Sequence, residues 1–184
     1  MRVKKWALLA ALAVLICTWL LVLATRVSTP REDYEEKLPA AERTEACIRV
    51  VHDLKLEMDI PINTASDIND TGVIGQDYSV ITTTLGELEA KRTSTNPNMA
   101  AVVVDMFHEL GLQPGDKVAV NCSGSFPALN IAVMCAVDTL GLDPMLISSF
   151  GASTHGANDP ELTYLDMEHY LYEQGLLEHR SAVI

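Results

Sequence analysis

The feature that most constrains the fold is a helix–Gly–Leu–x–Pro–strand pattern that occurs twice. The helical segment 97–110 is followed by GLQP and the apolar run 117–122, and the helical segment 127–140 by GLDP and the run 145–149. Each glycine suits the position just after a helix, and each proline prevents the helix from continuing. The two glycines are separated by about the 30 residues of a βαβ unit. The pattern therefore predicts that strands 117–122 and 145–149 are parallel neighbours.

The rest of the C-terminal part extends this pattern. A third helix is predicted over 160–174, and 181–184 has the composition of a further strand, as does 79–84. The apolar run 117–122 is typical of a strand with both faces covered. We therefore expect an α/β fold, with a Rossmann-like three-layer parallel-sheet domain over 73–184. Because its last strand begins where the chain ends, we expect the sheet to be incomplete at the C-terminus.

An apolar run from Trp6 to Ala24, interrupted only by Thr18, predicts a membrane anchor over 1–26. At about 1.5 Å per residue a helix of this length spans about 28 Å, close to the hydrocarbon core of a bilayer. Basic residues precede the run and acidic residues follow it, so the positive-inside rule predicts a single-pass cell-membrane protein whose bulk is extracytoplasmic. The alternative is a signal peptide cleaved after Ala24, but the run is longer than usual for one.

Residues 27–72 are predicted to form a helical stalk and a loop. Thr29 and Pro30 suit a helix start, and Pro39 is expected to interrupt the helix before a second one begins. In that second helix, apolar residues recur every three or four positions up to Met58, which is typical of a face that packs against a core or a partner helix.

Charge and cysteine content exclude several functions. The net charge is −12, and basic residues flanking the apolar run account for part of the positive charge, so the remainder is more acidic still. Such a surface argues against nucleic acid as a partner. Cys122 and Cys135 are too far apart in the predicted strand and helix to form a disulfide. No C-x-x-C pair occurs, so we expect no metal and no cofactor.

The strand-to-helix connection Ser123-Gly124-Ser125 is the first candidate site. In a parallel sheet it lies at the carboxyl end of a strand, where ligands usually bind, and the free N–H groups of the following helix favour an anion. It matches neither a dinucleotide nor a nucleoside-triphosphate motif, nor a hydrolase nucleophile elbow. The alternative is that Ser125 only caps the helix that starts at Pro127.

The connection 150–160 after the second strand would open at the same edge of the sheet. It carries His155, Asn158 and Asp159, together with Ser153. His155 and Asn158 are candidate ligand-binding residues, and His155 is also a candidate catalytic base for Ser123 or Ser125. Asp159 followed by Pro160 is better explained as the start of the third helix.

Lys91 and Arg92 are two of the few cations outside the membrane segment. They lie in the hydroxyl-rich segment TTTLGELEAKRTSTNP, which covers 82–97. Hydroxyls and cations together suit a site that binds carboxylates. The alternative is a solvated loop with capping hydroxyls.

The runs at 82–97, 123–130 and 148–168 resemble the poly-gamma-glutamate system protein family of capsule-forming bacteria, and the resemblance covers roughly Val73 to Glu168. It implies a membrane-anchored accessory of poly-gamma-glutamate capsule biosynthesis or export. Such a protein would bind the carboxylate-rich polymer or a synthase subunit. The alternatives are a serine-dependent amide hydrolase or transferase that acts on the polymer, and a purely structural module.

Overall fold

The computed structural model of the chain describes residues 5–27, 29 and 32–181. It divides into two compact units, Met1–Glu32 and Asp33–Ile184. The described residues of the first unit form one helix, α1 (Lys5–Ala24), whose apolar side chains are exposed. This helix is long and apolar enough to cross a membrane, as the sequence predicted.

The second unit begins with one long helix rather than two. Helix α2 (Tyr34–Glu57) continues through Pro39, so the predicted interruption is wrong. Pro39 removes only the backbone bond to the carbonyl four residues earlier, near the start of the helix. Directly after it, Ala40 and Ala41 are buried against the rest of the domain. We infer that this packing offsets the lost bond. The predicted start at Pro30 lies outside the described residues.

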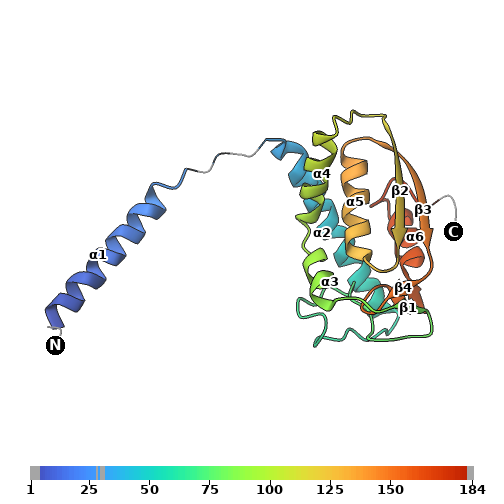
Figure 1. The fold of residues 1–184 in the computed structure, drawn as a ribbon, viewed down its shortest axis with the longest axis horizontal. Helices are drawn as coiled ribbons and strands as arrows, with labels where there is room; N and C mark the ends of the chain where they lie inside the picture. The colour runs from blue at the N-terminus through green and yellow to red at the C-terminus, as the bar shows by residue number, and fades with distance from the viewer. Residues whose placement is uncertain (1–4, 28, 30–31, 182–184) are drawn as a thin grey trace. The chain divides into compact units, whose positions relative to one another are not determined.

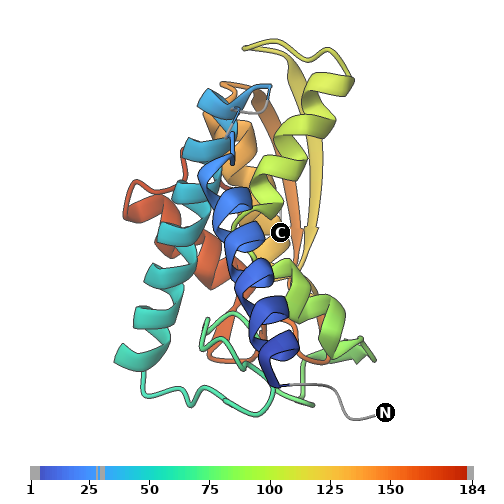
Figure 2. The ribbon, with the colours of Figure 1, turned by 90° about the vertical axis from the view of Figure 1, so that its left-hand side faces the viewer.

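Helices α2, α4 (Met99–Glu109) and α5 (Pro127–Thr139) pack against one another and form the helical part of the core. Small side chains such as Ala100, Ala132 and Ala136 are fully buried where α4 and α5 meet. A larger apolar cluster extends from α5 to the sheet and to α6 (Tyr164–Glu173). Figures 1 and 2 show α4 and α5 side by side, and Figure 1 shows α5 between α4 and the strands.

The predicted parallel strand pair is confirmed. Strand β2 (Lys117–Ser123) pairs in parallel with β3 (Asp143–Ser149) over their whole length. The glycines that follow α4 and α5 have the left-handed conformation of a C′ cap, with φ of +71° at Gly111 and +62° at Gly141. In both caps the next leucine N–H donates back to the last helical turn, Leu112 to Phe107 and Leu142 to Val137. Local sequence thus determines both helix ends.

The predicted covering of both sheet faces is wrong. Alternate residues of β2 and β3 are exposed, including Ala119 and Asn121 on β2 and Met145 and Ile147 on β3. The reason is that α4 and α5 lie on the same side of the sheet (Figure 1). In the described part of the chain each sheet has two strands, so the fold is a mixture of helices and small sheets. A Rossmann-like three-layer domain is not established.

Four very short strands lie at the end of the domain where β2 and β3 terminate (Figure 1 labels β1 and β4). Strand β1 (Thr82–Thr84) pairs in parallel with β4 (Ala152–Ser153), and β5 (Asn158–Asp159) pairs antiparallel with β6 (Leu162–Thr163). Helix α3 (Leu88–Ser94) follows β1.

The predicted start of the third helix is also wrong. Helix α6 begins after Thr163, whose hydroxyl accepts a hydrogen bond from the Asp166 N–H while the Asp166 carboxylate accepts one from the Thr163 N–H. The helix starts here and not at Asp159-Pro160, because the capping box satisfies the backbone N–H groups of both Thr163 and Asp166. Asp159 instead accepts hydrogen bonds from the Glu161 N–H and from the Gln76 side chain. The predicted strand 181–184 lies outside the described residues except for Ser181.

Candidate functional site

Three segments that are distant in sequence meet at the carboxyl end of the β2–β3 sheet. They are the connection 123–126, the connection 150–158, and the segment 82–91. The backbones are in direct contact: the Ala157 N–H donates to the Gly124 carbonyl at 2.7 Å. A Cβ on Gly156 would lie 2.6 Å from that same carbonyl oxygen, so only glycine fits there.

Lys91 lies at the centre of this junction. Its side chain comes from α3 and is 2% exposed. Its ammonium donates to the Ser153 hydroxyl at 2.7 Å and also to the Ser125 backbone carbonyl, and lies 3.7 Å from the centroid of the Phe126 ring. Burial lowers the pKa of Lys91 from its ordinary value of 10.5 to about 8. The predicted ligand residue Lys91 and the predicted loop residue Ser125 are therefore in contact.

No carboxylate in the described residues forms an ion pair with Lys91. The other two buried lysines of the described residues, Lys37 and Lys55, both have carboxylates nearby that act on their charge. Lys37 pairs with Asp105 and Asp33. Lys55 donates to two backbone carbonyls, and the charges of Asp159 and Asp67 partly offset the lowering of its pKa by burial. Lys91 is thus a buried cation held by neutral groups only.

Ser125 does not cap α5, contrary to the alternative considered from the sequence. Its hydroxyl accepts a hydrogen bond from the Ser153 N–H at 3.0 Å. The N-cap residue of α5 is Phe126, and no side chain caps the helix. Ser123 is exposed, its hydroxyl lies 3.4 Å from the Ser125 nitrogen, and its carbonyl accepts from Asn130. The start of α5 therefore keeps the partial positive charge of an uncapped helix terminus.

His155 is in the same connection as Ser153 but makes different contacts. Its backbone is left-handed, with φ of +60°, and its Nδ1 lies 3.5 Å from an Asp77 carboxylate oxygen without forming a hydrogen bond. Among the described residues, no hydrogen bond joins the His155 ring to Ser123 or Ser125. The structure does not assemble the predicted serine–histidine pair.

Asn158 is fully buried and positions the loops. Its side-chain oxygen accepts from the Gln76 N–H at 2.8 Å, and its amide nitrogen donates to the Gln76 carbonyl at 2.9 Å and to the Thr82 hydroxyl at 3.0 Å. These three bonds join the connection 150–158 to the segment that leads into β1. All of its hydrogen-bonding atoms are used inside the protein.

Arg92 points away from Lys91. Its guanidinium donates to the backbone carbonyls of Ser66 and Ala65, both at 2.8 Å, and pairs with Glu89. The two adjacent cations therefore do not act on one ligand. Arg92 and the residues after it line one wall of a separate cavity of about 600 Å³.

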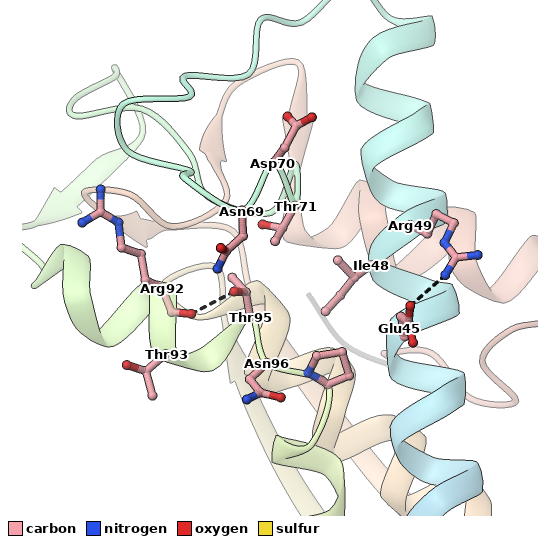
Figure 3. Close-up of a pocket in the computed structure, with 11 residues that line it drawn as sticks. Glu45, Ile48, Arg49, Asn69, Asp70, Thr71, Arg92, Thr93, Thr95 and Asn96 are labelled. Carbon is pink, nitrogen blue, oxygen red and sulfur yellow. Dashed lines mark hydrogen bonds and ion pairs between the residues drawn. The ribbon is translucent and has the colours of Figure 1, made fainter. Parts of the chain in front are cut away.

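Most residues that line this cavity are polar or charged, and it lies between α2, the loop near 70 and the turn after α3 (Figure 3). Hydroxyl and amide side chains face it from Thr71, Thr93 and Asn96, and one rim carries an Arg49–Glu45 ion pair at 2.8 Å. None of the serines of the loop junction lines it. It would suit a polar ligand, but its two arginines are already paired with Glu45 and Glu89.

One group of side chains has the spacing of metal ligands. Asp33, Glu36 and His108 place one potential ligand atom each within 4.8 Å of one another. Glu36 and His108 are 2.5 Å apart, and Lys37 lies 3.9 Å from Asp33. The Glu36–His108 hydrogen bond and the contact between Lys37 and Asp33 account for the grouping.

Sequence reasoning missed the contact between Ser153 and Lys91. This contact depends on the pairing of β1 with β4, two strands of three and two residues. Elements this short leave almost no periodic signal. A lysine in a threonine-rich segment gives no indication of which residue it contacts.

Comparison with known proteins finds no matching family model, no similar curated protein and no similar solved structure. The resemblance to the poly-gamma-glutamate system family therefore stays a prediction.

Proposed function

We propose that this chain is a membrane-anchored accessory protein of poly-gamma-glutamate capsule synthesis or export. Helix α1 supports the anchor, and the basic residues before it with the acidic residues after it support an extracytoplasmic location for the second unit. In this proposal the loop junction around Lys91 binds a carboxylate of the polymer, or of a synthase subunit that carries it. N-terminal sequencing of the purified protein tests the anchor, because a mature chain that starts at Thr25 would contradict it.

The observation that carries the proposal is the buried charge of Lys91 without a carboxylate partner among the described residues. Burying a cation is costly unless an anion offsets it. The uncapped start of α5, which directly follows the connection 123–126, adds partial positive charge next to that connection. A ligand carboxylate placed against 123–126, where Ser123 is exposed and Ser125 half-buried, would have Lys91 directly behind it. Such a ligand would supply the missing negative charge.

Binding of this kind depends on pH in a defined direction. The free protein holds Lys91 protonated below a pKa of about 8. A carboxylate favours the protonated form, so affinity should be highest below pH 8 and should fall as the pH rises above it.

The test is calorimetric titration of the full chain in detergent with short gamma-glutamate oligomers. We expect Lys91→Met to weaken binding about tenfold, which corresponds to one hydrogen bond or charge contact. The matched control is Lys117→Met, because the Lys117 side chain is 87% exposed at the start of β2. Equal affinity of wild type and Lys91→Met would overturn the proposal.

A second candidate function, amide hydrolysis or acyl transfer on the polymer, is favoured by the 2.7 Å contact between Lys91 Nζ and Ser153 Oγ. A neutral lysine can act as the base for a serine nucleophile. The Ser153 hydroxyl would give its proton to Lys91 and attack the amide carbonyl carbon. The C–N bond would then break, with the proton passing to the leaving amine, and water would hydrolyse the resulting ester.

The two candidates have opposite pH dependence. Catalysis needs neutral Lys91, so its rate should rise as the pH approaches and passes 8, where carboxylate binding weakens. A serine-directed fluorophosphonate should label Ser153, and labelling should be lost in Ser153→Ala and in Lys91→Met. Ser149→Ala, a change at an exposed strand serine, is the control. A wild-type chain that stays unlabelled at pH 8 to 9 would exclude the enzyme.

A further inference from the structure

Two buried thiols face each other between α2 and α5. Cys47 on α2 and Cys135 on α5 are both 0% exposed. Their sulfur atoms are 3.8 Å apart, although the residues are separated by 88 positions in the chain. The bonded distance in a disulfide is about 2.05 Å, so the two sulfurs are in contact and would have to move closer to form the bond.

The surroundings make the two thiols unequal. The hydrogen bond between the two thiols lowers the pKa of Cys135 and raises the pKa of Cys47. The nearby Thr44 hydroxyl also lowers the pKa of Cys135. Cys135 is therefore the thiol that ionises first, and a thiolate is the reactive form in disulfide chemistry.

We propose that Cys47 and Cys135 form an intramolecular disulfide in the mature protein. The oxidant is a disulfide, either a small molecule or a disulfide-bonded oxidoreductase, and the reaction rests on the proposed extracytoplasmic location, where such oxidants are present. The Cys135 thiolate attacks one sulfur of the oxidant and releases the other as a thiolate. The Cys47 sulfur then attacks the Cys135 sulfur of this mixed disulfide and releases the second sulfur of the oxidant as a thiolate. Two electrons pass to the oxidant, and the two thiol protons are released or taken up by its thiolates.

Because both sulfurs are fully buried, the bond would form as the chain folds. It would join α2 to α5 and enclose the chain from α3 to the loop 123–125, so that Lys91 and this loop lie within the closed ring. Crosslinks that enclose long segments restrict the unfolded chain most. The remaining thiols do not compete: Cys122 is buried on β2, and Cys17 is in α1.

The test uses the full chain, expressed in a bacterium with an oxidising periplasm and treated with N-ethylmaleimide before any reductant is added. Mass spectrometry of the unreduced digest should find the peptides of Cys47 and Cys135 joined, with Cys17 and Cys122 alkylated. Reduction should lower the Tm of the wild type by about 5–15 °C. It should leave the Tm of Cys47→Ser/Cys135→Ser unchanged, while Cys122→Ser should respond like the wild type.

Alkylation of both Cys47 and Cys135 in material taken directly from cells would overturn the proposal, whether or not the double variant folds. A second experiment, refolding of the reduced protein, then shows whether the sulfur geometry or the supply of an oxidant is at fault. If purified, reduced protein closes the bond during refolding with oxidised glutathione, the sulfur geometry is right and the chain does not meet an oxidant in the cell. If it stays open, the geometry itself is wrong. Neither result depends on polymer binding, so the proposed carboxylate site is tested separately.

Discussion

The Lys91 ammonium and the Ser153 hydroxyl are hydrogen-bonded at 2.7 Å, although the two residues are 62 positions apart in the chain. Lys91 comes from α3 and Ser153 from β4, so the contact depends on the pairing of β1 with β4. Ser125 contacts both residues: its backbone carbonyl accepts a hydrogen bond from the Lys91 ammonium, and its hydroxyl accepts one from the Ser153 N–H. The first predictions concern this group of three residues.

Lys91 should make stability depend on pH in a window above neutrality. Its pKa is about 8 in the folded chain and 10.5 ordinarily. Between these values the unfolded chain holds a proton that the folded chain has lost, so raising the pH through this window stabilises the fold. Urea unfolding of wild type and Lys91→Met at pH 7.5 and pH 10 measures the effect. The wild type should gain stability relative to the variant at the higher pH, and a constant difference would contradict the lowered pKa.

Gly86→Ala should displace Ser153 from Lys91. An added Cβ would lie 2.8 Å from the Ser153 hydroxyl oxygen and 3.2 Å from a carbon of the Lys91 side chain. We expect a loss of about 1–3 kcal/mol in the free energy of unfolding, which is typical of overpacking. Leu85→Ala is the control, since Leu85 is 84% exposed and should change stability little. If Gly86→Ala unfolds at the wild-type urea concentration, the loops are looser than the structure indicates.

Ser125→Ala should lower stability although Ser125 does not cap a helix. The variant removes the acceptor of the Ser153 N–H, and an unpaired buried donor costs about 1–3 kcal/mol. Ser149→Ala, at an exposed strand position, should stay within about 0.5 kcal/mol of wild type. Circular dichroism separates the two explanations: loss of a cap would reduce helix content at α5, whereas the loss expected here leaves it unchanged.

The part of the fold that could be predicted is the part determined by local sequence. Gly111 and Gly141 occupy left-handed positions that other residues rarely adopt, so the helix ends and the β2–β3 pairing followed from them. Coverage of the sheet could not be predicted in the same way. Val118 and Val120 suit a strand buried on one face as well as on two, and only the packing of α4 and α5 decides it.

The start of α6 shows how two local signals can compete. Asp159-Pro160 and the capping box of Thr163 with Asp166 are both present in the sequence. The box prevailed because Asp159 is occupied by bonds to Gln76 and Glu161. For the candidate site, the sequence indicated Lys91 and Ser125 separately. Their contact depends on the loop packing, which has no sequence period.

Asn158→Ala should be strongly destabilising. Asn158 is 0% exposed and makes three hydrogen bonds to Gln76 and Thr82. Its removal leaves two backbone groups of Gln76 without these partners, and we expect a loss of about 2–4 kcal/mol. Asn130→Ala, which breaks one bond to the Ser123 carbonyl, should cost about 1 kcal/mol. A stable Asn158→Ala that no longer binds gamma-glutamate would instead support the ligand role predicted from the sequence.

The last prediction concerns Gly124, where the absence of a side chain leaves room for an anion to approach the backbone N–H groups closely. The structure gives a second reason for glycine, because a Cβ there would lie 3.0 Å from the Ala152 side chain and 3.1 Å from the Gly151 carbonyl. Gly124→Val should therefore lose about 1–3 kcal/mol of stability through overpacking alone. Loss of binding in this variant does not by itself locate an anion.

Gly124→Ala separates the two reasons, because its single added carbon meets contacts that neighbours can relieve by a few tenths of an ångström. Unfolding and gamma-glutamate titration should be measured on both variants at a temperature where each is fully folded. If glycine serves only loop packing, Gly124→Ala binds like the wild type and its stability falls less than that of Gly124→Val. If the backbone N–H groups at 123–126 contact the carboxylate, Gly124→Ala loses affinity about tenfold while its unfolding midpoint changes little. That second outcome is the one we expect, because the exposed side of this loop is where a carboxylate would lie closest to both Lys91 and the start of α5.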